Sequence, residues 1–190
     1  MKMRMQKMVL VNILTILRIP LSILFCAVLY LSNKPFLLCY VLFFIIAATD
    51  FWDGKLARYF GVQTRFGAML DVVSDFFFIL TAIGSLYHLG IFPLWMIAVI
   101  SFKVVEFWIT SYLLVGKKGN QVFRFDKIGK AAAILCYILP VGVLFLWTTF
   151  PDLVFRRLIN IICILIFLMI VISSVQRIRM TCNFFNESRN

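Results

Sequence analysis

Four aspartates lie close together in an otherwise apolar chain, at a spacing that could support chemistry. Only eight acidic residues occur in the sequence, and Asp50, Asp53, Asp71 and Asp75 are four of them. The first two are three positions apart and the last two are four apart, so each pair shares one face of a helix. If the two faces meet, four carboxylates with no matching lysine form a hard-oxygen site for Mg²⁺ or Mn²⁺, with room for two ions.

The energetic cost of these acids argues that something compensates them. A charged aspartate at mid-bilayer costs about 2.5–3.5 kcal/mol on insertion scales, and four together also repel one another. The alternative is that they merely cap helix ends in headgroup water, but two same-face pairs are more than a helix end requires. Bound divalent cations are the compensation that we expect.

The residues between the acids carry further information. Gly54 and Ala57 remove bulk beside the first acidic pair, which would let a phosphorylated ligand approach the backbone. Close packing of membrane helices is the competing explanation for such small residues. Arg58 supplies a planar cation suited to a diphosphate, although it could instead anchor the helix end at the membrane surface. Thr64 could add a hydroxyl contact.

Together these residues form the pattern D-x2-D-G-x2-A-R-x8-G-x3-D-x3-D, which is present without a gap in residues 50–75. The pattern resembles the signature of the CDP-alcohol phosphotransferases, membrane enzymes of phospholipid synthesis. The resemblance implies an enzyme with six membrane helices that works as a homodimer. It also implies transfer of a phosphatidyl group from CDP-diacylglycerol to the hydroxyl of a small alcohol, with release of CMP.

The resemblance assigns roles position by position. It implies that Asp50 and Asp71 bridge two metal ions, that Asp53 binds the first ion, and that Asp75 binds the second and accepts a proton. A second stretch, Asn12-Ile-Leu-Thr15-Ile-Leu-Arg18-Ile-Pro20, resembles the N-x2-T-x2-R-x-P opening of the family, which faces the nucleotide. Asn12 and Thr15 could otherwise be ordinary polar residues near a helix start. The residues expected to bind the CDP-linked lipid are Gly54, Ala57, Arg58, Thr64, Gly67, Asn12, Thr15 and Arg18.

The chemistry that we expect is a direct displacement. Metal ions that bridge diphosphate oxygens neutralise charge and hold the phosphorus in line with the attacking hydroxyl. Asp75 would take the hydroxyl proton while CMP leaves. No serine, cysteine or histidine nucleophile is required, and His88, the one histidine, is expected near the opposite membrane face.

The acceptor is less well defined by the sequence. Lys127 and Lys130 would suit a phosphorylated acceptor, such as glycerol 3-phosphate or an inositol phosphate. Lys103 could also bind the acceptor, but an ion pair with Glu106, one turn away, would be a sufficient structural explanation. The residue after the fourth aspartate is Phe76, where the glycerol-phosphate branch usually has lysine. Serine and other alcohols therefore stay open as acceptors.

Composition indicates how these residues are positioned. The chain has 190 residues, of which 63% are hydrophobic and 14% charged, whereas a soluble domain carries about a quarter charged residues. A membrane helix needs about 20 apolar residues, and the strand alternation of a barrel is missing. We therefore predict an all-α membrane protein with six transmembrane helices, at 9–31, 35–58, 66–89, 91–115, 129–150 and 153–176.

The charge distribution predicts the orientation. Nineteen Lys and Arg residues give a net charge of +11, and most of them fall on one side of the six spans. By the positive-inside rule that side, with both termini and the active site, is cytoplasmic, at the plasma membrane if the source is bacterial or archaeal. The same excess would attract anionic lipids and phosphorylated substrates. Nucleic acid binding is not expected, because the sequence offers no soluble basic domain to support it.

The predicted organisation has one catalytic domain. Residues 1–8 are expected to form an interfacial amphipathic segment, residues 9–180 the six-helix membrane catalytic domain, and residues 181–190 a disordered tail. A polar loop is expected near 116–128. The five cysteines are odd in number and form no C-x-x-C pair, so we interpret them as small hydrophobic residues.

Two other classes of protein could be considered. A membrane cation transporter would explain the acids but not the glycines, alanine and arginine at their spacings, and it would need polar residues tracing a path to the far side. A non-catalytic scaffold would have no reason to retain four unpaired acids. Release of CMP from CDP-diacylglycerol that depends on Mg²⁺ or Mn²⁺, without ion flux, would distinguish the enzyme.

Overall fold

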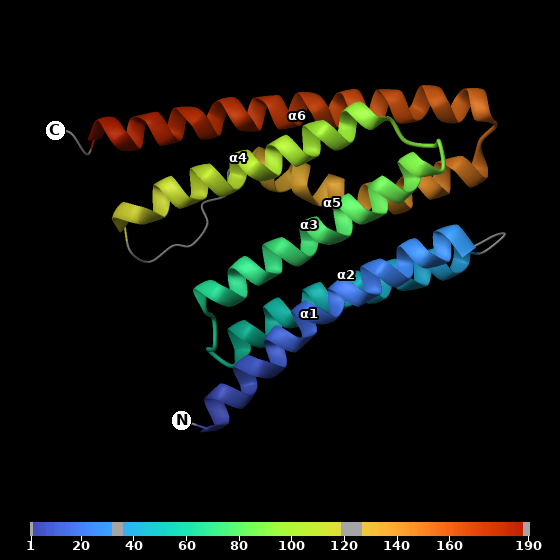
Figure 1. Cartoon of the computed structure of the whole chain (residues 1–190). Helices are drawn as coiled ribbons and strands as arrows, with labels where there is room; N and C mark the ends of the chain where they lie inside the picture. Colours follow the sequence, from blue (N-terminus) through green and yellow to red (C-terminus); the bar gives the residue numbers. More distant parts are fainter. Residues whose placement is uncertain (1, 32–35, 119–126, 188–190) are drawn as a thin grey trace. The chain divides into compact units, whose positions relative to one another are not determined.

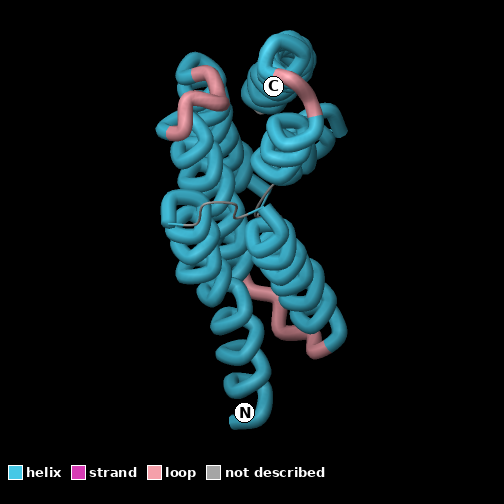
Figure 2. Tube along the Cα trace, turned by 90° about the vertical axis from the view of Figure 1, so that its right-hand side faces the viewer, coloured by secondary structure: helices cyan, strands magenta, loops and turns pink. Residues whose placement is uncertain are grey.

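The computed structural model describes residues 2–31, 36–118 and 127–187. These residues form six helices and no strand (Figure 2). The helices are α1 (Lys2–Leu31), α2 (Phe36–Tyr59), α3 (Arg65–His88), α4 (Leu94–Lys118), α5 (Lys127–Thr149) and α6 (Asp152–Glu187) (Figure 1). Each contains a stretch long and apolar enough to cross a membrane. The prediction of an all-α protein with six membrane helices is confirmed, and the chain is a multi-pass integral membrane protein.

The helix ends differ from the predicted boundaries in two places. Helix α1 begins at Lys2, so the segment predicted to lie along the interface is continuous with the first span. Helix α6 continues to Glu187, whereas a disordered tail was predicted from residue 181. The Thr181 hydroxyl donates to the carbonyl of Arg177 at 2.9 Å, one turn back in the same helix. Much of the polar loop predicted near 116–128 falls in residues 119–126, outside the described residues.

The chain divides into two compact units, Met1–Gly90 and Ile91–Asn190. In the first unit, α1 packs against both α2 and α3 (Figure 1). The ring of Phe78 in α3 contacts Phe25 of α1 edge-on, with centroids 5.6 Å apart, and lies 6.1 Å from Phe43 of α2. All three rings are buried. This aromatic core fixes the three helices against one another next to the polar residues described below.

In the second unit, α6 packs against both α4 and α5. The buried residues of α6 recur every three or four positions, as expected for one face of a helix. The apolar part of this face contains Phe155, Ile159, Cys163, Ile166 and Ile170. The same face continues with polar residues, namely Ser173, Arg177 and Thr181.

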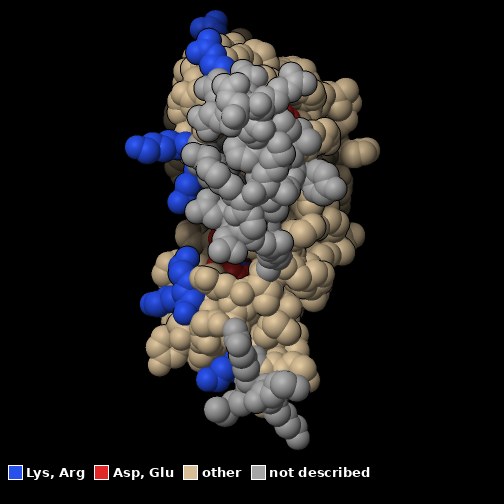
Figure 3. Space-filling model, turned by 90° about the vertical axis from the view of Figure 1, so that its left-hand side faces the viewer, with Lys and Arg blue, Asp and Glu red and all other residues tan. Residues whose placement is uncertain are grey.

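The surface is apolar over much of its extent, as a lipid-facing surface must be. Leu31, Leu37 and Phe44 are 84%, 78% and 68% exposed, which would be costly in water. In Figure 3, the coloured surface is mostly neutral, with lysine and arginine side chains projecting outward. The acidic side chains appear there only as small recessed patches.

Candidate functional site

A tight turn brings the two acidic helix segments side by side. Helix α2 ends in a turn in which the amide of Val62 donates to the carbonyl of Ala57 at 3.1 Å. Gly61 adopts φ +60° in this turn, a conformation that a side chain disfavours. Thr64 then caps α3, because its hydroxyl accepts a hydrogen bond from the amide of Gly67 at 3.0 Å. The last turns of α2 and the first turns of α3 therefore lie close together.

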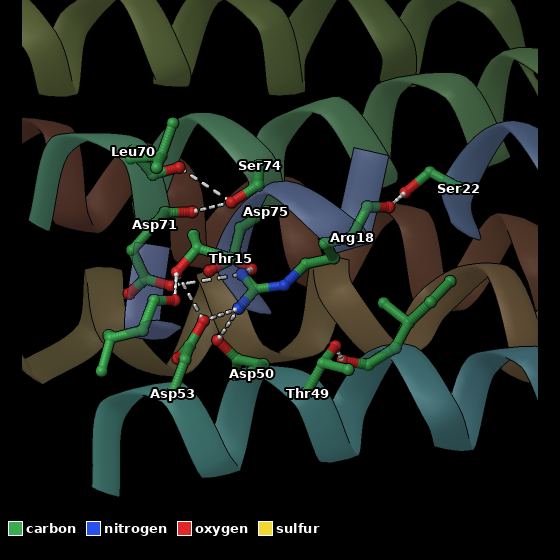
Figure 4. A network of polar contacts seen from close by, with 12 residues as sticks. Thr15, Arg18, Ser22, Thr49, Asp50, Asp53, Leu70, Asp71, Ser74 and Asp75 are labelled. Carbon is green, nitrogen blue, oxygen red and sulfur yellow. Dashed lines mark hydrogen bonds and ion pairs between the residues drawn. The ribbon is translucent and has the colours of Figure 1, made fainter. Parts of the chain in front are cut away.

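Arg18 of α1 lies at the point where the aspartates converge (Figure 4). Its Nη2 is 3.0 Å from Oδ1 of Asp50 and 2.8 Å from Oδ2 of Asp53, both on α2. Its Nη1 is 3.2 Å from Oδ1 of Asp71 and also forms an ion pair with Asp75, both on α3. One guanidinium thus joins all four carboxylates, so the predicted convergence of the two acidic faces is present in the structure.

The carboxylates differ in how far they are buried. The side chain of Arg18 is fully buried and that of Asp53 is 4% exposed. The side chains of Asp50, Asp71 and Asp75 are 38%, 43% and 32% exposed. The cluster is therefore closed on the Arg18 and Asp53 side and open on the other, where a ligand can reach the oxygens.

Three of the carboxylates have a geometry that fits a metal ion. Asp50, Asp53 and Asp71 each offer an oxygen, and these three oxygens lie within 4.8 Å of one another. Carboxylate oxygens are the ligands that Mg²⁺ and Mn²⁺ prefer, and the partial exposure of two of the residues leaves access for the ion and its water. Asp75 is outside this group of three and is joined to it through Arg18.

The predicted N-terminal residues also lie at the cluster. The Thr15 hydroxyl donates to Oδ2 of Asp53 at 2.9 Å, and both residues are buried. Asn12 lies near the start of α3, where a Cβ on Gly67 would be 3.4 Å from its Oδ1. The same Cβ would be 3.1 Å from Oγ1 of Thr64. Gly67 therefore permits a close approach between α1 and α3, which is a packing role.

Four of the residues expected to contact the CDP-linked lipid lie at the end of α2 and the start of α3, namely Gly54, Ala57, Arg58 and Thr64. A Cβ on Gly54 would meet nothing within 4 Å, so the packing explanation finds no support within the described residues at this position. Ala57 is half-buried, whereas Arg58 and Thr64 are exposed. Gly54 therefore leaves space next to Asp53, and Arg58 supplies an exposed cation in the last turn of α2.

The candidate acceptor residues belong to the second unit and are described within it. Lys103 donates to Oε2 of Glu106 at 3.0 Å and to the Ser174 hydroxyl at 3.1 Å. The Ser174 hydroxyl also bonds to Glu106, so the ion pair considered as the structural alternative is present, and Ser174 links it to α6. Lys127 and Lys130, at the start of α5, are exposed.

Sequence reasoning missed two features of these polar residues. It treated the aspartates as lacking a cationic partner, whereas Arg18, a cation inside an apolar span, is that partner. It also assigned no partners to Arg177, which is buried against Thr110 and Ser111 of α4 and lies over the Phe107 ring. Each arginine lies within an apolar segment of the sequence. This position could have indicated a buried polar contact, since an intramembrane cation requires polar partners.

The sequence of this chain is similar to those of known proteins. A family described as CDP-alcohol phosphatidyltransferase matches residues 8–175. The chain is 34% identical over 146 residues to "CDP-diacylglycerol--glycerol-3-phosphate 3-phosphatidyltransferase" of Blochmanniella floridana, which covers 71% of this chain and 74% of that protein. Proteins of the same name are similar in Bacillus subtilis, at 33% over 90 residues, and in Pectobacterium atrosepticum, at 39% over 84 residues.

The matched regions differ in extent among these relatives. The match covers 47% of this chain and 46% of the Bacillus subtilis protein, and 40% of this chain and 44% of the Pectobacterium atrosepticum protein. The chain therefore spans less than half the length of these two relatives. The family match, in contrast, includes α2 and α3 with all four aspartates and Arg18 of α1.

Proposed function

This chain belongs to the CDP-alcohol phosphatidyltransferase family, and we propose that it transfers a phosphatidyl group from CDP-diacylglycerol to the hydroxyl of a small alcohol. The observation that carries the proposal is the convergence of four carboxylates from α2 and α3, next to the open space at Gly54. This arrangement fits a divalent-cation site next to a place for a diphosphate.

Asp50, Asp53 and Asp71 would hold Mg²⁺ or Mn²⁺, and Asp75 would contribute to a site for a second ion. When bound, such ions neutralise the diphosphate and make the nucleotide phosphate a better leaving group. Gly54 leaves room for the diphosphate beside the acids, and Arg58 lies at the same helix end to bind its oxygens. Asn12 and Thr64, which both lie near Gly67 at the start of α3, would contact the nucleotide.

The reaction itself would be a single displacement at phosphorus. The acceptor oxygen forms a bond to the phosphorus that carries the diacylglycerol, and the bond from that phosphorus to the bridging diphosphate oxygen breaks. CMP takes the electron pair and leaves, while the hydroxyl proton passes to Asp75. Asp75 suits this role because its side chain is 32% exposed, which leaves it within reach of an acceptor hydroxyl.

The acceptor that we propose is glycerol 3-phosphate. The names of the relatives in Blochmanniella floridana and Bacillus subtilis specify that acceptor, and Lys127 and Lys130 are exposed cations that a phosphate group could bind. Phe76 departs from the lysine usual in that branch, so inositol phosphate and serine are the alternatives to test. No observation on the described residues favours a cation transporter.

The setting of the reaction is also proposed. The basic residues near the ends of α1, α2 and α4 favour a cytoplasmic active site at the plasma membrane. We expect a homodimer, as is usual in the family, and the exposed apolar side chains of the spans leave surface for a second copy.

The proposal is tested by supplying the purified protein with CDP-diacylglycerol and one acceptor at a time, with the lipid product identified by mass. Phosphatidylglycerophosphate and one equivalent of CMP are expected with glycerol 3-phosphate in the presence of Mg²⁺ or Mn²⁺. Asp152→Asn is the control for substitutions of the four clustered aspartates. The Asp152 carboxylate is 69% exposed and pairs only with Arg156 among the contacts described. No product with any acceptor, or ion flux in liposomes, would count against the enzyme.

A further inference from the structure

A single guanidinium contacts all four carboxylates of the proposed metal centre, and it comes from a third helix. Nη2 of Arg18 contacts the acidic pair of α2, and Nη1 contacts the acidic pair of α3. Each of these two nitrogens therefore contacts the acidic pair of one helix. The arrangement uses the planar fork of arginine, which the single ammonium group of lysine cannot reproduce.

Neighbouring residues of α1 form hydrogen bonds around Arg18 as well. Its side chain is fully buried, and the Ser22 hydroxyl donates to its backbone carbonyl at 2.6 Å. Thr15, one turn before it on α1, donates to the same Asp53 oxygen that Nη2 contacts. The guanidinium thus contacts the acids from the closed side of the cluster.

The charges of this arrangement have a direct consequence. Arginine stays protonated in proteins, so the guanidinium offsets part of the repulsion among four carboxylates. A divalent cation that enters the same cluster is attracted by the carboxylates and repelled by the guanidinium. Arg18 must then stabilise the cluster when metal is absent and weaken the binding of the metal itself.

We propose that Arg18 is a positioning residue that acts as the built-in counter-ion of the aspartate cluster. It holds the acidic pairs of α2 and α3 together between rounds of metal binding and lowers the affinity for divalent ions, so that they exchange. This assignment replaces the contact with the CDP-linked lipid predicted for Arg18 from the sequence. It rests on the proposed function, because it requires the cluster to bind metal.

The test compares wild type, Arg18→Gln and Arg18→Lys in detergent, with Arg156→Gln as control, because Arg156 is 65% exposed and belongs to another ion pair. Mn²⁺ binding is measured by electron paramagnetic resonance, and the melting temperature is measured in EDTA and in saturating Mn²⁺. We expect Arg18→Gln to bind Mn²⁺ at least about tenfold more tightly. Its melting temperature should fall in EDTA and recover most of the loss in Mn²⁺. Arg18→Lys should show smaller changes in the same directions, and Arg156→Gln should match wild type.

The outcomes separate the two proposals. If Arg18→Gln melts equally far below wild type in EDTA and in Mn²⁺, with the same or weaker Mn²⁺ affinity, the counter-ion role is wrong. If Arg18→Gln does not fold, the test relies on Arg18→Lys. Unchanged Mn²⁺ affinity of Arg18→Lys, together with an unchanged melting temperature in EDTA, would then overturn the inference. If wild type binds no Mn²⁺, the metal centre itself is wrong.

Discussion

At the scale of single residues, Asp75 differs from the other three carboxylates in its surroundings. Asp50, Asp53 and Asp71 offer oxygens that converge, whereas Asp75 is connected to them through Arg18. Its partial exposure leaves it reachable by an acceptor hydroxyl. Asp53, almost fully buried and bonded to both Thr15 and Arg18, is instead suited to a fixed ligand.

We expect Asp75→Asn to reduce turnover by about 10²–10⁴-fold, the usual contribution of a general base. The amide cannot accept the hydroxyl proton, but its size and its position on α3 are unchanged. CMP release and nucleotide binding should be measured together, because binding should stay close to wild type. Near-normal CMP release by this variant would contradict the role given to Asp75.

Gly54 and Gly67 should respond differently to the same substitution. A Cβ on Gly54 meets nothing within 4 Å, so Gly54→Ala should fold with unchanged or slightly higher stability and raise the KM for CDP-diacylglycerol. A Cβ on Gly67 would press on Oγ1 of Thr64, which caps α3, so Gly67→Ala should lower the melting temperature. Thermal melts and substrate titrations check both. A Gly54→Ala variant as unstable as Gly67→Ala would show that Gly54 is a packing residue.

At the scale of helices, apolar runs of membrane-spanning length were sufficient to predict all six elements, because a lipid environment forces the backbone of such runs into helices. The two acidic faces followed from spacing along α2 and α3. The position of Arg18 among the four aspartates could not be predicted from the sequence. Its contacts depend on how α1 packs against residues more than thirty positions away in the sequence. Burial of Arg177 against α4 was missed for the same reason.

In the second unit, the link between α4 and α6 made by Lys103, Glu106 and Ser174 is expected to be structural. The side chains of the ion pair are only 15% and 9% exposed, and Oε1 of Glu106 has no hydrogen-bond partner among the described residues. Removing one charge leaves the other buried, which costs about 3–5 kcal/mol, whereas replacing both is tolerated.

Glu106→Leu should therefore destabilise the protein more than the double variant Lys103→Met/Glu106→Leu. Unfolding in detergent and CMP release should be measured for both. Retention of activity by the double variant would assign Lys103 to structure. Loss of activity at normal stability, with a raised KM for the acceptor, would support acceptor binding instead.

At the scale of the whole molecule, the predicted orientation places the acidic cluster on the cytoplasmic side. The basic residues that support this orientation lie at the ends of the spans, and the cluster is near the helix ends joined by the 60–64 turn. Sealed inside-out membrane vesicles should form product from externally added glycerol 3-phosphate. Right-side-out vesicles should do so only after permeabilisation, and the opposite pattern would reverse the predicted topology.

The central claim is that the aspartates of α2 and α3 bind the divalent cations on which phosphatidyl transfer depends. The most direct measurement follows Mn²⁺ binding and CMP release on the same sample while a chelator is titrated in and Mn²⁺ is then restored. We predict that both signals disappear together and return together in wild type, and that both are lost in Asp50→Asn and Asp71→Asn. Turnover that persists after the ions are removed, or Mn²⁺ binding that is unchanged in both variants, would contradict the claim.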